Sequence, residues 1–430
     1  MTSVTRWTLR CASCAHVIHP QSAAHSCPAC GSLLEVVHVG PWPLAGDLRR
    51  SFDARFGFGP STERSGVWRY RELLFDVADT EIVSLHEGNT ALLEHPRVTA
   101  YAGTARLWMK HEGMNPTGSF KDRGMTAGLT RAMAIGAKGV ACASTGNTSA
   151  SLAAYAARAG LPAFVFVPSG QVALGKLTQT LAYGARTILI QGDFDACLAL
   201  VREVADELGV YLLNSVNPFR IEGQKTIAIE LLHELGWSVP DWIALPAGNL
   251  GNTAAVGKAL FELHEAGVIS RLPRVLAVQA SGAAPFVASF ESGFSTQRTA
   301  KAETVATAIK IGNPASYHRA VEVIRRTNGA VLAVSDEAIL DAKAVIDAAG
   351  IGCEPASAAS VAGARAAIGR GLIQPHETVA AILTGHVLKD PGVLSWYHRD
   401  ADPAPRRANR PVEVAPSREA IVALLRDVTG

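Results

Sequence analysis

The chain contains the stretch Asn115-Pro116-Thr117-Gly118-Ser119-Phe120-Lys121-Asp122-Arg123-Gly124, which predicts a tight turn followed by a helix. Pro116 disfavours a helical backbone at Asn115, and Gly118 permits a sharp bend, so Lys121 falls on the first helical turn. The helix dipole and partial burial both lower the pKa of an amine in that position. Such an amine can form a Schiff base with an aldehyde cofactor and then move protons. An exposed lysine at the start of an ordinary helix is the alternative, and two further segments argue against it.

Two other segments have the composition of loops that receive an anion at the start of a helix. Residues 144–151 read Ser-Thr-Gly-Asn-Thr-Ser-Ala-Ser, follow the apolar run 139–143 and open a helix predicted to reach Ala159. Residues 248–252 read Gly-Asn-Leu-Gly-Asn and follow the predicted strand 242–246. In such turns, backbone N–H groups and short polar side chains converge on a negatively charged group. Either loop alone could be a capped tight turn, and the G-x-G-x-x-G spacing of dinucleotide-binding folds is absent.

These segments together resemble the pyridoxal-phosphate enzymes of fold type II, the tryptophan synthase β group, and within it the threonine synthase family. The stretch around Lys121 is similar to that family's lysine motif. Other segments that resemble the family are 87–90, 216–226, 306–314, 353–360 and 383–390. The resemblance spans the chain from about Cys11 to Asp390.

The resemblance implies an α/β architecture of fold type II, with two parallel-sheet αβα domains preceded by a small N-terminal zinc-ribbon-like knuckle. The alternation of β-rich runs and helical patterns also favours parallel sheets flanked by helices. Strands are expected at 163–167, 186–190, 242–246, 275–279, 330–334 and 379–383. The expected domains are the knuckle at 1–38, a large cofactor-binding domain at 39–113 and 214–390, a small mobile domain at 114–213, and a C-terminal tail with a helix at 391–430.

The resemblance also implies roles around the cofactor, pyridoxal 5′-phosphate. Lys121 would hold the cofactor covalently and then act as the catalytic acid and base. Asn147 would donate a hydrogen bond to the ring hydroxyl oxygen, and Thr384 would face the pyridine nitrogen. A neutral hydroxyl there does not force that nitrogen to be protonated, which suits eliminations better than transamination. The cofactor's phosphate would be cradled by Gly248, Asn249, Leu250, Gly251 and Asn252.

The substrate implied by the resemblance is O-phospho-L-homoserine, which carries an α-carboxylate and a γ-phosphate. The reaction would be that of a carbon–oxygen lyase: γ-elimination of phosphate and β-addition of water yield L-threonine, in the last step of threonine biosynthesis. Arg220 could instead form an ion pair with Glu222 or Glu230. The residues that would bind the two anions are Ser144, Thr145 and Thr148 for either one, and Asn214 and Arg220 for the phosphate.

Two other functions stay open at the level of the sequence. A sister enzyme on the same scaffold could act on phosphoserine by β-replacement, like a cysteate synthase, or dehydrate serine or threonine. A non-catalytic chain could carry a zinc knuckle and a decayed ligand-sensing domain. Lys121, Asn147, the glycine loop and Thr384 argue against the second of these. The segment 217–226 favours a phosphorylated homoserine over the shorter substrates.

Four cysteines near the start of the chain have the spacing of a metal site. They form two C-x2-C pairs separated by twelve residues: Cys11, Cys14, Cys27 and Cys30. Paired thiolates on two tight knuckles suit tetrahedral Zn²⁺, and four thiolates leave no open position for catalysis. The sequence therefore predicts a structural zinc ion. A knuckle without metal, or disulfides in an oxidising compartment, are the alternatives.

Composition indicates a large folded enzyme rather than a binding protein for nucleic acid or membranes. The 430 residues are 48% hydrophobic, which argues against general disorder. Lys and Arg number 40 against 38 Asp and Glu, so no excess positive charge favours nucleic acid or an anionic membrane. The most apolar stretch, 150–167, is interrupted by Arg158 and Pro162, and residues 1–10 lack the apolar core of a signal peptide. We therefore expect a cytoplasmic enzyme, and the resemblance adds the expectation of a homodimer.

Overall fold

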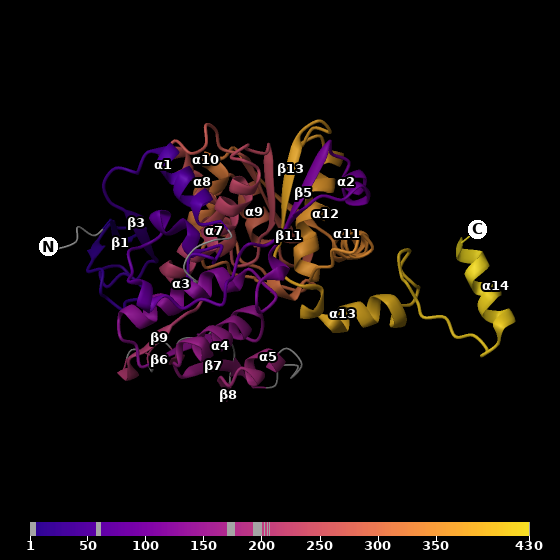
Figure 1. The fold of residues 1–430 in the computed structure, drawn as a ribbon, viewed down its shortest axis with the longest axis horizontal. Coiled ribbons are helices and arrows are strands. Elements are labelled where there is room, and N and C mark those ends of the chain that lie inside the picture. The colour runs from indigo at the N-terminus through magenta and orange to yellow at the C-terminus, as the bar shows by residue number, and fades with distance from the viewer. Residues whose placement is uncertain are drawn as a thin grey trace. The chain divides into compact units, whose positions relative to one another are not determined.

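A six-stranded sheet forms the centre of the computed structural model, which describes residues 6–56, 62–169, 177–191, 200, 201, 203, 205 and 207–429. The strand order is β12-β11-β10-β13-β5-β4, and every pair is parallel except β4 with β5. Figure 1 shows β5 and β13 side by side, although they lie far apart in the sequence. The strands are β4 Leu92–Leu93, β5 Arg106–His111, β10 Trp242–Pro246, β11 Arg274–Ala280, β12 Ala330–Val334 and β13 Thr378–Leu383.

Helices cover both faces of this sheet. Side chains alternate between the two faces along each strand, so each strand contributes apolar side chains to a hydrophobic cluster on either face. Ile243 and Leu245 of β10 pack in one hydrophobic cluster, whereas Trp242 and Ala244 pack in the other. The helices of the first cluster are α1 Ala45–Ala54, α7 Pro218–Glu234, α8 Gly251–Glu265, α9 Pro285–Glu291 and α10 Tyr317–Arg326. Those of the second are α2 Pro96–Ala102, α11 Asp336–Asp347 and α12 Pro355–Gly369. The central strands β10, β11 and β13 are therefore buried between two helical layers.

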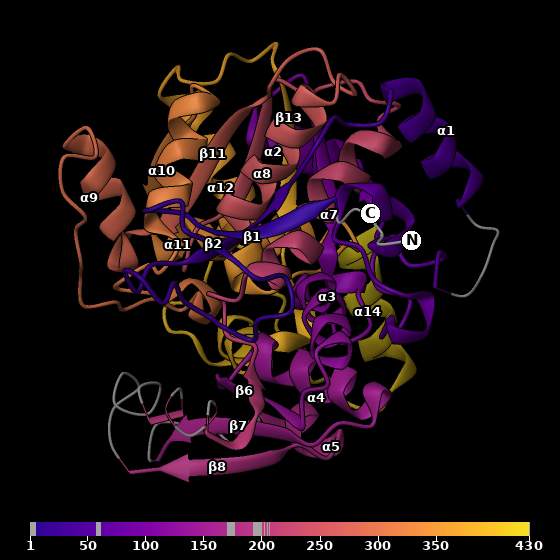
Figure 2. The ribbon, with the colours of Figure 1, turned by 90° about the vertical axis from the view of Figure 1, so that its left-hand side faces the viewer.

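A second, wholly parallel sheet of four strands has the order β8-β7-β6-β9 and is seen with α4 and α5 in Figure 2. Its strands are β6 Gly139–Ala143, β7 Ala163–Pro168, β8 Arg186–Ile190 and β9 Val210–Leu212. The adjoining helices are α3 Lys121–Ala134, α4 Asn147–Ala159 and α5 Thr178–Ala182. The strands expected from the sequence all occur in these two sheets, which confirms the α/β class with two parallel sheets.

A small antiparallel sheet with the order β2-β1-β3 precedes the parallel sheets. It consists of β1 Trp7–Cys11, β2 Val17–Ile18 and β3 Leu34–His38. Leu9 pairs with both Ile18 and Val36, and its side chain is fully buried. Trp7 packs edge-on against Phe219 of α7, with the ring centres 5.6 Å apart. The sheet is thereby attached to the first turn of α7.

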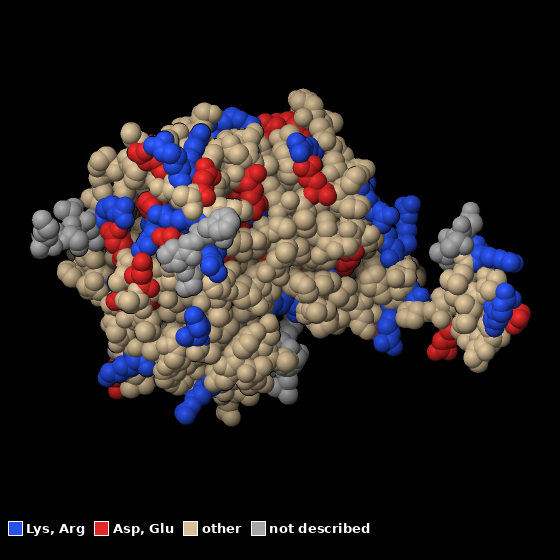
Figure 3. Space-filling view, viewed as in Figure 1, with Lys and Arg blue, Asp and Glu red and all other residues tan. Residues whose placement is uncertain are grey.

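The chain divides into two compact units, Met1–Lys389 and Asp390–Gly430. The second contains α13 Pro391–Ser395, a π-helical turn at Trp396–Asp400 and α14 Arg418–Thr429, whose first turn is capped by the hydroxyl of Ser417. The finer division of the first unit into a large and a mobile small domain stays a prediction. No helix in the described ranges is long and apolar enough to cross a membrane. On the face drawn in Figure 3, acidic and basic side chains are interspersed, and neither sign forms a continuous patch.

Candidate active site

The turn that carries Lys121 is joined to the end of β13. Gly118 has a φ of +83°, in the left-handed region that glycine readily adopts. The backbone N–H of Phe120 donates to the carbonyl of Thr384 at 3.0 Å, and that of His386 donates to the carbonyl of Gly118 at 2.9 Å. Lys121 then begins α3. These two hydrogen bonds bring the predicted catalytic lysine and Thr384 to the same carboxyl edge of the large sheet, where ligands of open α/β sheets bind.

The amine of Lys121 lies in an environment that disfavours its charged form. Burial, and to a smaller extent the positive charge of Arg220, lower the pKa of Lys121 to about 7, while the carboxylate of Glu354 acts in the opposite direction. The nitrogen lies 4.2 Å from the ring centre of Phe120. A substantial fraction of this amine is therefore unprotonated near neutral pH, as a nucleophile and base requires.

Arg220, on the first turn of α7, is fully buried without a carboxylate partner in the described part of the chain. One terminal nitrogen donates to the carbonyl of Leu213 at 3.1 Å, and the other two guanidinium nitrogens have no hydrogen-bond partner there. Burial lowers the pKa of Arg220 to about 10. The ion pairs with Glu222 or Glu230 that the sequence left open are not formed. Glu222 pairs with Lys225 at 2.6 Å, and Glu230 pairs with Arg123 at 2.7 Å.

The glycine loop at 248–252 leads from β10 into α8. Leu250 has a φ of +62°, and a Cβ at Gly248 would lie 2.9 Å from the Cα of Ile309, so the backbone passes close to its neighbour. Asn249 holds the loop in place, since its Nδ2 contacts the Ser215 hydroxyl and its Oδ1 accepts from the backbone N–H of Ala315 at 2.6 Å. At the start of α8, the buried amide of Asn252 and the hydroxyl of Thr253 have no partner among the described residues.

The loop at 144–148 contributes Asn147, which is the first residue of α4. Its Nδ2 donates to Oε2 of Glu354 at 2.9 Å. Thr384, which is 4% exposed, donates to Oε1 of the same carboxylate at 3.1 Å and lies 3.0 Å from the hydroxyl of Ser357. One carboxylate therefore binds both Asn147, predicted to contact the ring hydroxyl oxygen of the cofactor, and Thr384, predicted to face its pyridine nitrogen.

The other predicted substrate residues surround the end of β6. Asn214 donates to the carbonyl of Ala143 at 3.2 Å and accepts from its N–H at 3.1 Å, so its amide fixes the strand end. The hydroxyl of Ser144 accepts from the backbone N–H of Gly146 at 3.3 Å. Thr145 and Thr148 are half-buried in the same loop. These side chains therefore lie at the start of α4, as anion-binding residues would.

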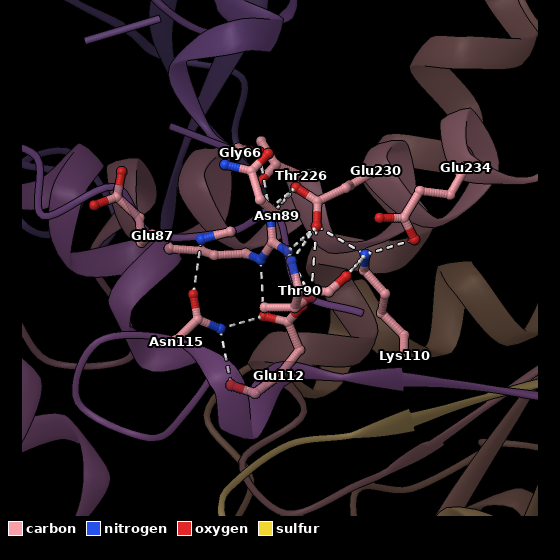
Figure 4. Close-up of polar contacts among 12 residues, drawn as sticks. Gly66, Glu87, Asn89, Thr90, Lys110, Glu112, Asn115, Thr226, Glu230 and Glu234 are labelled. Carbon is pink, nitrogen blue, oxygen red and sulfur yellow. Dashed lines mark hydrogen bonds and ion pairs between the residues drawn. The ribbon is translucent and has the colours of Figure 1, made fainter. Parts of the chain in front are cut away.

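A network of buried ion pairs and hydrogen bonds, centred on Arg123, holds the lysine turn in place (Figure 4). Nε of Arg123 contacts Oε2 of Glu112 at 2.7 Å, and Nδ2 of Asn115 donates to the same oxygen at 2.8 Å. One carboxylate therefore holds the chain on both sides of Lys121. Burial alone would raise the pKa of Glu230, but the charges of Arg123 and Lys110 outweigh it and hold that pKa below its usual range. Removing one partner of such a buried pair typically costs about 3–5 kcal/mol.

Two acidic residues of the site were missed by sequence reasoning. Asp122, next to the lysine, accepts from the backbone N–H of Thr117 at 2.7 Å and from the hydroxyl of Ser151 at 2.5 Å. Burial raises the pKa of Asp122 to about 6, against the effect of these hydrogen bonds. Glu354 lies directly before Pro355 at the start of α12 and is 2% exposed. Its only sequence signal was membership of the 353–360 segment.

The four cysteine sulfurs lie within 4.8 Å of one another. The Sγ atoms of Cys11 and Cys30 are 3.4 Å apart, those of Cys14 and Cys27 are 3.7 Å apart, and all four thiols are free. Tetrahedral Zn²⁺ with Zn–S bonds of about 2.3 Å separates its sulfur ligands by about 3.8 Å. The cluster is therefore compatible with a metal ion.

The described residues fit a phosphorylated aldehyde cofactor. They offer an amine with a lowered pKa at Lys121, unpartnered polar groups at the start of α8, and hydrogen-bonding side chains at Asn147 and Thr384. Residues 83–385 match the family model for pyridoxal-phosphate dependent enzymes. The model and the site geometry therefore agree on the cofactor class.

Comparison with known proteins identifies the branch of this superfamily. The threonine synthase of Methanosarcina acetivorans is 45% identical over 385 residues, covering 89% of this chain and 92% of that protein. That of Methanocaldococcus jannaschii is 42% identical over 421 residues, covering 97% and 99%. The crystal structure of threonine synthase from Escherichia coli covers 98% of this chain and 100% of its own, with a TM-score of 0.69 and 18% identity, which shows a shared fold. The resemblance seen in the sequence is confirmed, and the chain belongs to the threonine synthase family of pyridoxal-phosphate enzymes of fold type II.

Proposed function

We propose that this chain converts O-phospho-L-homoserine and water to L-threonine and inorganic phosphate. The observation that carries the proposal is Arg220, a buried guanidinium whose charge acts on Lys121 and of which two nitrogens have no partner among the described residues. A buried charge without a counter-ion is costly, and a phosphate oxyanion that accepts both nitrogens would complete it. Of the substrates that the sequence left open, those with a phosphate group satisfy this requirement.

Lys121 would hold pyridoxal phosphate covalently, Asn147 and Thr384 would contact its ring, and residues 248–252 would bind its phosphate. When bound, the cofactor supplies an electron sink that acidifies the hydrogen at the substrate's α-carbon. Lys121 removes that proton, since burial and Arg220 keep much of its amine neutral near pH 7. Arg220 and Asn214 hold the substrate's phosphate, and the loop of Ser144, Thr145 and Thr148 holds its carboxylate.

Water must reach the β-carbon only after phosphate has left the γ-carbon. We propose that the segment 114–213, which contains the four-stranded sheet, moves against the large sheet to exclude water before that point. The turn at Lys121 connects the two parts and is fixed by Glu112 on both sides. Because this turn lies at the start of the segment and is tied to Glu112, we expect Lys121 to move less than the loop at 144–148, which closes over the substrate.

The test is product analysis with purified protein loaded with pyridoxal phosphate. We expect equal amounts of phosphate and L-threonine from O-phospho-L-homoserine, and neither phosphate nor keto acid from O-phospho-L-serine, L-serine or L-threonine. Turnover of the shorter substrates alone would keep Lys121 as the base but would refute the substrate assignment of Asn214 and Arg220.

We also propose that Cys11, Cys14, Cys27 and Cys30 bind a structural Zn²⁺ ion. The cluster has four thiol ligands and no open coordination position, which suits a structural rather than a catalytic ion. Metal analysis should find about one zinc per chain in the parent and none in a Cys27→Ser, Cys30→Ser variant. By the family resemblance we further propose that the protein is cytoplasmic and forms a homodimer. Light scattering of the purified protein tests the oligomeric state.

A further inference from the structure

We propose that Glu354 is a positioning residue that orients both Asn147 and Thr384 toward the cofactor ring. The inference rests on the cofactor contacts proposed above and extends them to a group that does not itself bind the ring. Glu354 is a buried carboxylate at the start of α12, and the proposed reaction gives it no proton to transfer. Its contacts give it a different role.

The two oxygens of Glu354 serve two different elements of the site. Oε2 accepts from Nδ2 of Asn147 at the start of α4, at 2.9 Å. Oε1 accepts from the hydroxyl of Thr384 at the end of β13, at 3.1 Å. One rigid carboxylate thus links the two side chains that would lie at the ring hydroxyl and at the pyridine nitrogen. Movement of either side chain alone would break one of these bonds.

Hydrogen-bond chemistry makes this link directional. An ionised carboxylate only accepts hydrogen bonds, so it selects the amide rotamer of Asn147 in which Nδ2, and not Oδ1, faces Glu354. The amide nitrogen has two protons, and the second stays free for the ring hydroxyl oxygen. The single proton of the Thr384 hydroxyl is likewise directed to Glu354, so Thr384 would meet the pyridine nitrogen as an acceptor and favour its protonated form. The carboxylate therefore decides which atoms these two residues present to the cofactor.

The backbone around Glu354 holds the carboxylate in this position. Its N–H donates to the carbonyl of Gly385 at 3.0 Å, and the N–H of Gly385 donates to the hydroxyl of Ser357 at 2.9 Å. A Cβ on residue 385 would lie 2.5 Å from the carboxyl carbon of Glu354. Only glycine at position 385 leaves room for the carboxylate beside Thr384. The glycine of the Thr384-Gly385 pair is explained by this contact.

Glu354 also acts on the catalytic amine through its charge. Burial and Arg220 lower the pKa of Lys121, and the carboxylate of Glu354 raises it. Replacing Glu354 by glutamine keeps the shape and removes the charge, so the pKa of Lys121 should fall below about 7. This shift reports the charge of Glu354 near the amine, and it is measured independently of the hydrogen bonds to Asn147 and Thr384.

The first experiment is a double-mutant cycle on the dissociation constant of pyridoxal phosphate, measured by titration of the cofactor-free protein. Glu354→Gln should weaken binding at least about tenfold, since a hydrogen bond to a charged group is lost. Asn147→Ala should weaken it by a similar factor. The double variant should bind pyridoxal phosphate only slightly more weakly than the more affected single variant, because Glu354 acts partly through Asn147. Effects that multiply in full would overturn the inference.

The second experiment follows the rate at which the cofactor-free protein captures pyridoxal phosphate as the pH is varied. The midpoint should move to lower pH in Glu354→Gln and stay unchanged in Ser360→Ala, a buried hydroxyl that donates only to the carbonyl of Ser357. If Glu354→Gln does not fold, Glu354→Asp replaces it in the cycle: the charge is kept, so the midpoint should stay while the coupling to Asn147 is lost. An unchanged midpoint in Glu354→Gln, or retained coupling in Glu354→Asp, refutes the inference.

These measurements separate the inference from the proposed function. If Asn147→Ala and Thr384→Ala both bind the cofactor as the parent does, the assignment of the ring contacts is wrong and the inference falls with it. If both weaken binding while Glu354→Gln leaves affinity and midpoint unchanged, the proposed site stands and the positioning role of Glu354 is refuted.

Discussion

Replacing Arg220 by methionine tests the central electrostatic feature of the site. The side chain keeps a similar length but loses a charge with two unpartnered nitrogens. A hydrogen bond to a charged group contributes about 1.5–3 kcal/mol, so two such bonds to the substrate's phosphate contribute about 3 kcal/mol or more. We expect kcat/KM for O-phospho-L-homoserine to fall at least about 100-fold, since 1.4 kcal/mol is about tenfold. The affinity for pyridoxal phosphate should change by less than about threefold.

The same substitution should not destabilise the ligand-free protein. Burial lowers the pKa of Arg220 from its ordinary value to about 10. At pH 7, below both values, the charged side chain therefore costs the folded state about 3 kcal/mol. Losing the hydrogen bond to Leu213 costs about 1–2 kcal/mol. The free energy of unfolding of Arg220→Met should therefore rise by about 1–2 kcal/mol, measured with urea at pH 7.

Arg131→Met is the matched control. Arg131 is also a buried arginine, but its guanidinium donates to the carbonyls of Pro20 and Ser22 and packs 4.9 Å from the ring centre of Phe219. Its substitution should lower stability and leave kcat/KM nearly unchanged. The reasoning is refuted if Arg220→Met loses cofactor and substrate affinity to the same extent, because Arg220 would then bind the cofactor's phosphate. It is also refuted if the variant is strongly destabilised, because Arg220 would then have a protein partner.

Three further predictions concern single groups. Lys121→Ala should abolish turnover and covalent cofactor binding while its circular dichroism matches the parent; retained threonine formation would remove Lys121 as the base. Removing the proposed zinc, by chelation or by Cys27→Ser, should lower the free energy of unfolding by at least about 3 kcal/mol, whereas an equal stability with no metal bound would make the cluster a metal-free knuckle. The hydroxyl of Ser151 donates to Asp122, whose pKa burial raises to about 6 although this hydrogen bond acts to lower it. Ser151→Ala should therefore lower the free energy of unfolding by about 1–2 kcal/mol above pH 7, where Asp122 is ionised. The loss should be clearly smaller below pH 5, where Asp122 is protonated. Ser360→Ala, which loses a bond to a carbonyl, should show no such pH dependence; equal pH profiles for the two variants would contradict the titration of Asp122.

The sequence predicted the parts of the fold that depend on local patterns. The buried strands were visible as apolar β-rich runs between helical segments, because strands covered on both faces lack polar alternation. The lysine turn and the glycine loop were visible because each needs particular residues for its backbone, such as Gly118 with its φ of +83°. In both cases the information lies within about ten neighbouring residues.

The contacts that the sequence did not reveal join distant segments. Glu354 meets Asn147 and Thr384 only because α12, α4 and β13 end at the same place. Arg220 was ambiguous for the same reason: Glu222 and Glu230 are close in sequence, but their carboxylates are occupied by Lys225 and Arg123. The lowered pKa of Lys121 was expected from the helix dipole and burial, whereas the structure adds the charge of Arg220 as a cause.

The arrangement of these charges relates substrate binding to the strength of the base. Arg220 lowers the pKa of Lys121, and that effect is largest while the guanidinium has no counter-ion. An anion bound to Arg220 cancels part of its field, so the amine becomes a stronger base when the substrate's phosphate is in place. In the proposed mechanism, the field would return once phosphate has left the site, and Lys121 would then hold its proton less tightly, which would favour returning that proton to the substrate carbon. A single unpaired arginine can therefore favour proton removal before phosphate leaves and proton return afterwards.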